Sequence, residues 1–103
     1  MIQDFGEKIF CFVRYKVKEG QRQALMDAIN EKQIQERYQK QPGNVEYSFF
    51  APTNDENLLF LVDLWEDQKT FDAHLHTDVG PDFAEIKKKY IDDTTLIFQF
   101  GGK

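Results

Sequence analysis

The sequence predicts an α+β fold of the ferredoxin-like type, in which a four-stranded antiparallel sheet carries its helices on one face. Three observations support this prediction. Four segments have the apolar patterns of strands, helical segments follow the first and the third of them, and the order along the 103 residues is β-α-β-β-α(α)-β. A chain of this length fits one domain, so we expect residues 1–103 to form a single unit.

The first strand is predicted at residues 8–18, where alternate residues are apolar. One face would carry Ile9, Cys11, Val13, Tyr15 and Val17. The other face is apolar only at its start, with Phe10 and Phe12, and then becomes charged with Arg14 and Lys16. The two ends of this second face therefore meet different surroundings.

A helix is predicted over residues 21–40, which are rich in Gln, Glu, Lys and Ala. The residues Leu25, Ala28 and Ile29 would form its buried side, and the segment 42–44, Pro-Gly-Asn, would end it. Two strands follow at residues 45–51 and 57–66, joined by a turn-rich loop. The second of these is apolar on both faces, which favours a central place in the sheet.

The last third of the chain predicts two short helices and a final strand. Asp67 is a suitable N-cap for a helix that runs to about His76. A further helix opens at Asp78 and runs to about Tyr90, with its apolar residues on one side. Residues 94–100, with the sequence TTLIFQF, form the last strand.

The face of the sheet that lacks helices needs a cover, because Phe10, Phe12 and apolar residues of the later strands lie on it. The sheet of a second copy is the simplest cover, and it would give a homodimer with two-fold symmetry. We therefore expect a dimer whose interface is this face of the sheet.

The composition narrows the classes of partner. The net charge is −5, from 18 acidic and 13 basic residues, which disfavours nucleic-acid binding. The one basic run, residues 87–89, predicts a solvated helix face. Cys11 is the only cysteine, so no internal disulfide can form, and it is expected to be a small buried apolar residue. Since no apolar run approaches the ~20 residues of a membrane span, we expect a soluble, cytoplasmic protein without membrane contact.

The candidate functional residues lie between Leu61 and Thr77, a stretch that holds the only Trp and both His residues. Trp65 is either a large core residue at a strand end or a wall that stacks on a flat ligand. His74 is either a buried, neutral, hydrogen-bonded residue or a proton acceptor beside a cavity. His76 is offset from His74 around the helix and is expected to be exposed, so the pair does not predict a metal site.

Asp63 shares a strand face with Leu61 and Trp65. A carboxylate within an apolar strand is costly unless it is paired. Two interpretations follow. It pairs with Arg14 or Lys16 as a structural bridge, or it orients a histidine or a hydroxyl group of a substrate.

The stretch WEDQKTFDAHLHT resembles the signature of the antibiotic biosynthesis monooxygenase family, through Trp65, Asp67, Phe71, His74, Leu75 and Thr77. The order of elements also resembles that family over nearly the whole chain. The resemblance implies a dimeric α+β barrel. Members include cofactor-independent monooxygenases of phenols and quinols, haem-degrading enzymes and an isomerase.

Three departures from the family pattern bear on function. Quinol monooxygenases often carry a second His soon after the Thr, where Val79 or Gly80 stands here. Gly80-Pro81 is unusual at the start of the following helix. Haem degraders have an iron-binding His on that helix, whereas DFAEIKKKY has none, so haem degradation is disfavoured.

The resemblance predicts a cofactor-independent monooxygenase that acts on a phenolic, quinol or enolisable small molecule and on molecular oxygen. His74 and Trp65 would be catalytic, and the substrate would be bound by Leu61, Asp63, Phe71 and Phe83. No cofactor and no metal ion would be needed. The alternatives are a non-catalytic dimeric module that binds a small hydrophobic ligand, or a related isomerase. In each case Trp65 and His74 are expected to line one pocket between the helices and the sheet, away from the dimer interface.

Overall fold

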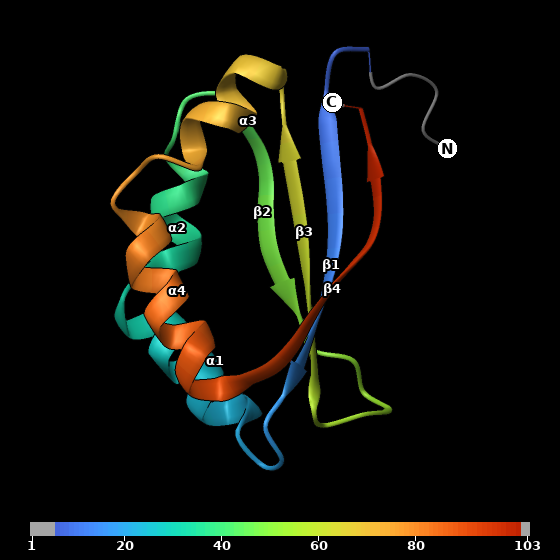
Figure 1. Cartoon of the computed structure of the whole chain (residues 1–103), viewed down its shortest axis with the longest axis vertical. Helices are drawn as coiled ribbons and strands as arrows, with labels where there is room; N and C mark the ends of the chain where they lie inside the picture. The colour runs from blue at the N-terminus through green and yellow to red at the C-terminus, as the bar shows by residue number, and fades with distance from the viewer. Residues whose placement is uncertain (1–5, 102–103) are drawn as a thin grey trace.

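A computed structural model describes residues 6–101 of the chain (Figure 1). Its strands are β1 (Ile9–Val17), β2 (Asn44–Phe50), β3 (Leu58–Trp65) and β4 (Ile91–Phe100). Its helices are α1 (Arg22–Glu31), α2 (Ile34–Gln39), α3 (Gln68–His74) and α4 (Val79–Tyr90). The strands form one antiparallel sheet in the order β2-β3-β1-β4. The predicted ferredoxin-like fold is thus confirmed.

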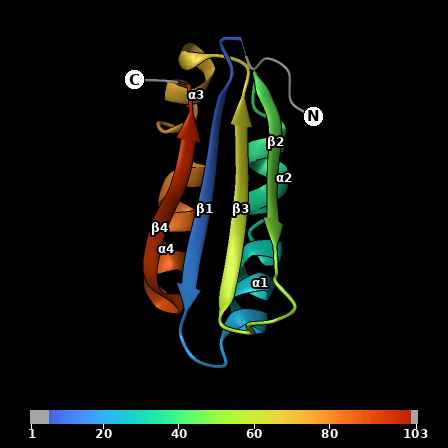
Figure 2. The same ribbon diagram turned by 90° about the vertical axis from the view of Figure 1, so that its right-hand side faces the viewer.

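The helices cover one face of the sheet and leave the other open. Figure 1 shows them packed on one side of the strands, and Figure 2 shows the strands from the opposite side with the helices behind. β3 lies between β2 and β1, as its two apolar faces predict. We call the two sides the helix face and the open face of the sheet.

Two differences from the sequence prediction exceed one or two residues. The segment expected as one helix over residues 21–40 is two helices, because Gln33 adopts a left-handed conformation with φ of 54° and breaks the helix. The last strand begins at Ile91, directly after α4, rather than at residue 94. No helix within residues 6–101 is long and apolar enough to cross a membrane.

The helix face holds the core. Every second residue of β3 is buried there, as is every second residue of β1 except the half-buried Val13, and the helices contribute further apolar side chains. The largest side chains with almost no exposed surface are Trp65, Ile9, Leu25, Ile34 and Leu59. Burial of this kind provides most of the stability of a small domain.

The open face carries a cluster of five phenylalanines, Phe10, Phe12, Phe60, Phe98 and Phe100. The ring of Phe12 stacks on Phe60 at 5.3 Å between centroids and meets Phe98 at 5.6 Å. These contacts do not cover the cluster, since Phe98 keeps 42% and Phe100 keeps 52% of its surface exposed. Large exposed apolar patches of this kind mark interaction surfaces.

Candidate active site on the helix face

The candidate site begins at the C-terminal end of β3. The alternation of this strand turns Leu61, Asp63 and Trp65 toward the helices, and all three are buried. The indole of Trp65 is fully buried, and its Nε1–H donates a hydrogen bond of 2.5 Å to Asp63 Oδ1. One oxygen of this buried carboxylate is therefore held by a donor on its own strand.

Helix α3 delivers His74 to the same place. The helix begins at Asp67, whose side chain caps it by accepting a hydrogen bond of 2.9 Å from the backbone N–H of Thr70, as predicted. Within the helix, Nδ1 of His74 hydrogen-bonds the carbonyl oxygen of Phe71. A carbonyl oxygen can only accept, so Nδ1 carries the hydrogen and Nε2 of the neutral ring has a free lone pair.

The imidazole of His74 lies over the indole of Trp65. The two ring centroids are 4.5 Å apart, with the planes inclined by 19°. In this position Nε2 of His74 is 3.9 Å from Oδ2 of Asp63. The ring of Phe71 completes the group, with its centroid 5.0 Å from that of His74. Asp63 and Trp65 of β3 and His74 of α3 therefore form one buried Asp–His–Trp cluster.

The predicted ion pair between Asp63 and Arg14 or Lys16 is wrong. Arg14 lies opposite Phe60 in the ladder between β1 and β3, which places it on the open face. Asp63 lies opposite Cys11 and faces the helices. Because successive side chains of a strand alternate between faces, the two basic residues cannot reach the carboxylate through the sheet. The carboxylate lies instead 3.9 Å from Nε2 of His74, and its role in orienting the histidine stays a prediction.

Burial shifts the pKa values of both ionisable groups in the cluster toward one another. It raises the pKa of Asp63 to about 6, against the lowering effect of the Trp65 hydrogen bond. It also lowers the pKa of His74 below its usual 6.5, although the hydrogen bond to Phe71 opposes this. Near neutral pH the cluster therefore holds a carboxylate and a neutral imidazole, and the imidazole can accept one proton.

Two buried tyrosines that the sequence did not indicate adjoin the cluster. Tyr38 of α2 meets the His74 ring edge-on at 5.7 Å, and its own ring stacks on Tyr47 of β2 at 4.3 Å. Tyr47 lies directly opposite Asp63 in the ladder between β2 and β3. Only the strand register and the break before α2 bring them here, and neither could be known from local patterns.

The remaining predicted site residues are all on the helix face but not all beside His74. Leu61 is two residues before Asp63 and is 3% exposed. Phe83 of α4 is also buried, but its ring contacts Tyr15 at 6.0 Å and Phe49 at 5.7 Å. Cys11 is buried as expected, and burial raises the pKa of its thiol to about 11.

A cavity of about 210 Å³ reaches His74 from outside α3. The residues that line it are Gln41, Pro42, Lys69, Thr70, Ala73, His74 and Thr77. The sequence predicted that His74 and Trp65 would share a pocket, whereas only His74 lines this cavity and Trp65 lies fully buried behind the imidazole.

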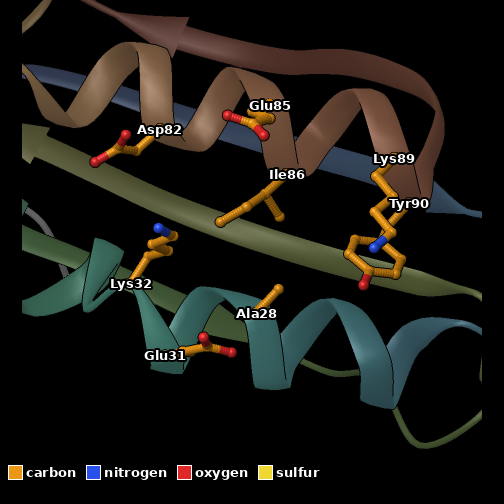
Figure 3. Close-up of a pocket in the computed structure, with 8 residues that line it drawn as sticks. All are labelled: Ala28, Glu31, Lys32, Asp82, Glu85, Ile86, Lys89 and Tyr90. Atoms are coloured by element: carbon orange, nitrogen blue, oxygen red, sulfur yellow. The ribbon is translucent and has the colours of Figure 1, made fainter.

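A second hollow of about 210 Å³ lies between α1 and α4, away from the cluster. Figure 3 shows its charged side chains, with Lys32 and Asp82 pointing toward each other across it and Tyr90 at one end. Its Lys, Glu and Asp side chains come from two solvent-facing helices. It resembles a solvated surface groove rather than a site for an apolar substrate.

The model of the antibiotic biosynthesis monooxygenase family matches residues 9–89, which include β1, β3 and the whole Asp–His–Trp cluster. The chain belongs to this family. No curated protein matches its sequence. Among solved structures, a family member from Nitrosomonas europaea superposes with a TM-score of 0.82 at 18% identity, over 98% of this chain and 95% of the other.

Two further structures show the same fold in distant relatives. A conserved protein of Methanosarcina mazei has a TM-score of 0.81 at 19% identity, with 96% of each chain covered. The cofactor-independent oxygenase SnoaB of Streptomyces nogalater has a TM-score of 0.74 at 13% identity, with 95% of each chain covered. At such identities the likeness establishes the fold of this family member and leaves its reaction to the chemistry of the site.

Proposed function

We propose that this protein is a cofactor-independent monooxygenase of a phenolic, quinol or enolisable small molecule. The observation that carries the proposal is the buried pair of Asp63 and His74, stacked on Trp65 and reached by a cavity. The family membership and the fold shared with SnoaB, itself a cofactor-independent oxygenase, support the same class of reaction. His74 is the proposed catalytic base, and the buried Trp65 acts through it by holding the imidazole and the Asp63 carboxylate in place.

In the proposed reaction a hydroxyl group of the substrate gives its proton to Nε2 of His74. The imidazolium that forms lies 3.9 Å from the Asp63 carboxylate, and the negative charge of that carboxylate stabilises it. The substrate anion is electron-rich and can reduce molecular oxygen directly. The substrate carbon that takes up one oxygen atom loses its hydrogen, so the substrate supplies all the electrons and becomes a quinone or ketone. The other oxygen atom leaves as water with the two hydrogens that the substrate has lost. Apolar neighbours such as Leu61 and Phe71 exclude solvent, which protects the anion until oxygen reacts.

We also propose that the protein acts as a homodimer in the cytoplasm, with the open faces of two sheets packed together. The partly exposed phenylalanine cluster supports this arrangement, because a second sheet would bury it. The site would then lie on the opposite side of each sheet from the interface. Each subunit would have its own Asp–His–Trp cluster.

The test is oxygen uptake with a panel of hydroquinones and hydroxylated polycyclic aromatics, on the wild type and on His74→Ala. Loss of turnover in His74→Ala, with a melting temperature within a few degrees of the wild type, is the expected result. His76→Ala is the matched control, since His76 is exposed two residues away and should change neither quantity. A histidine that only packs would instead lower the melting temperature by several degrees, as ~1 kcal/mol does in a domain of this size.

The alternative function is a dimeric module that binds a small hydrophobic ligand without reaction. The complete burial of Trp65 behind His74 favours it, since a covered indole cannot stack on a ligand. Binding of panel compounds by both the wild type and His74→Gln, without oxygen uptake by either, would establish this function in place of the oxygenase.

A further inference from the structure

The tyrosines beside the Asp–His–Trp cluster have hydroxyl groups without a protein partner. Tyr38 is 6% and Tyr47 is 3% exposed, and within residues 6–101 neither hydroxyl makes a hydrogen bond. The one fully covered polar side-chain atom without a partner in that part of the chain is Gln41 Oε1. Both tyrosine hydroxyls therefore keep a small accessible surface. Each hydroxyl can therefore donate a hydrogen bond to a ligand that reaches this surface.

Both hydroxyls remain protonated under all physiological conditions. Burial is the main cause, and the charge of Asp63 adds to it, raising the pKa of Tyr38 to about 12. The pKa of Tyr47 is raised well above its usual value by burial, with further contributions from Tyr15 and Asp63. Neither group can then serve as a base at neutral pH. Each is a hydrogen-bond donor on a ring that is almost completely buried.

The geometry gives the donors a common target. Nε2 of the neutral His74 ring has a free lone pair, so a ligand hydroxyl group that reaches the imidazole through the cavity beside α3 can donate a hydrogen bond to it. Within residues 6–101, the one side chain that donates a hydrogen bond to the Asp63 carboxylate is Trp65, which binds Oδ1. Tyr47 flanks Asp63 across the ladder, and Tyr38 flanks the imidazole while stacking on Tyr47. Tyr38 is thus in ring contact with the imidazole that would take the proton, and Tyr47 stacks on Tyr38.

We infer that the hydroxyl groups of Tyr38 and Tyr47 donate hydrogen bonds to the substrate oxygen that gives its proton to His74. This inference rests on the proposed function and makes it more specific. The proton passes from the substrate oxygen to Nε2, and the negative charge left on that oxygen is met by two fixed O–H dipoles. Preorganised donors aimed at a developing oxyanion are among the strongest contributions to catalysis.

The same arrangement makes the site selective for hydroxyl over amino compounds. A phenolate oxygen has lone pairs for two donors, whereas the nitrogen of an aromatic amine is a poor acceptor because its lone pair is delocalised into the ring. We therefore expect phenols and enols to bind more tightly than isosteric anilines.

The experiment measures binding without turnover. We would titrate 4-nitrophenol, whose visible absorbance reports its ionisation, and the isosteric 4-nitroaniline into anaerobic protein. The wild type should bind the phenol at least about tenfold more tightly than the aniline and should favour its ionised form. Tyr38→Phe and Tyr47→Phe should each lower the affinity for the phenol about tenfold and leave that for the aniline unchanged.

Tyr90→Phe is the matched control, because Tyr90 belongs to the distant groove between α1 and α4 (Figure 3). It should leave both affinities unchanged. Melting temperatures separate binding from packing, since removing an unpartnered hydroxyl should leave stability the same or higher. A lower melting temperature with an unchanged preference for the phenol would overturn the inference, and so would a wild type that binds neither probe.

A second measurement uses the wild type alone and so does not depend on whether a variant folds. With the four tyrosines labelled at Cζ, two of the wild-type signals should shift on addition of 4-nitrophenol and not of 4-nitroaniline. No selective shift would overturn the inference. Tyrosine-dependent binding without oxygen uptake by any phenol would defeat the proposed oxygenase and retain the binding site. Oxygen uptake together with phenol binding that neither tyrosine substitution changes would retain the proposed oxygenase and overturn the role of the two tyrosines.

Discussion

Along β3, the residues that point toward the helices differ in kind from those that point away. Toward the helices lie Asp63 and Trp65, both almost completely buried, with a histidine and two tyrosines against them. Away from the helices the strand is apolar throughout and only half-buried. The helix face therefore buries polar groups and the open face exposes apolar groups, and each lowers the free energy of unfolding. A functional site explains the buried polar groups, and an interaction surface explains the exposed apolar groups.

The largest expected effect comes from removing the centre of the helix face. Trp65→Ala deletes a fully buried indole that packs on His74 and donates to Asp63. We expect the free energy of unfolding, measured by urea denaturation, to fall by about 3–5 kcal/mol. Phe50→Ala is the control on the open face, where the side chain is 54% exposed and a loss below about 1 kcal/mol is expected. Equal losses would show that the two faces do not differ in packing.

The next prediction measures how much the buried carboxylate of Asp63 lowers the free energy of unfolding. Folding raises the pKa of Asp63 from 3.8 to about 6, so the folded chain holds this proton more tightly than the unfolded chain. Ionisation of Asp63 as the pH rises between those two values therefore lowers the free energy of unfolding. Asp63→Asn removes this loss and keeps an oxygen that can accept from Trp65.

We expect the stability of Asp63→Asn relative to the wild type to increase by about 3 kcal/mol at most between pH 4 and pH 7. His74 acts in the opposite direction, since its lowered pKa adds stability as the pH rises toward 6.5, but both proteins contain it. Chemical denaturation at a series of pH values measures the difference. A difference that stays constant with pH would show that Asp63 is not desolvated in the folded chain.

A smaller effect tests how the chain holds α3 over the sheet. Gly43 has φ of 83°, and a Cβ there would overlap the side chain of Thr70 in the first turns of α3. Gly43→Ala should therefore lower the free energy of unfolding by roughly 1–3 kcal/mol and displace the helix that carries His74. Gly20→Ala is a matched control, because its φ of 73° is also left-handed but a Cβ there meets nothing within 4 Å. Equal losses would mean that only the backbone conformation matters.

Much of this comparison could be predicted from local patterns in the sequence. The alternation of β1 and β3 gave the two faces, and Asp67 gave the start of α3, because both depend on neighbours within a few residues. The break in the helix at Gln33 could not be predicted, since no residue around position 33 requires a left-handed backbone conformation there. The neighbours of Asp63 depend on how β2 pairs with β3, and a strand of alternating residues fits several registers equally well until its tertiary contacts are known.

The smallest effect on the chain itself concerns the open face and tests the proposed dimer. Phe98 is 42% exposed and contacts the rings of Phe10, Phe12 and Phe100. Phe98→Asp should cost a single chain only about 1 kcal/mol, because so much of the ring is already in water. In a dimer, by contrast, the same change places a charge between two packed sheets, and burying an unpaired charge is far more costly than losing a ring contact. We expect light scattering to give twice 12.2 kDa for the wild type and 12.2 kDa for Phe98→Asp.

Leu75→Asp is the control for this prediction. It introduces the same charge at a side chain that is 58% exposed at the end of α3, and it should leave the dimer intact. A wild type of 12.2 kDa at micromolar concentration would refute the dimer and would leave the exposed phenylalanines for a different partner.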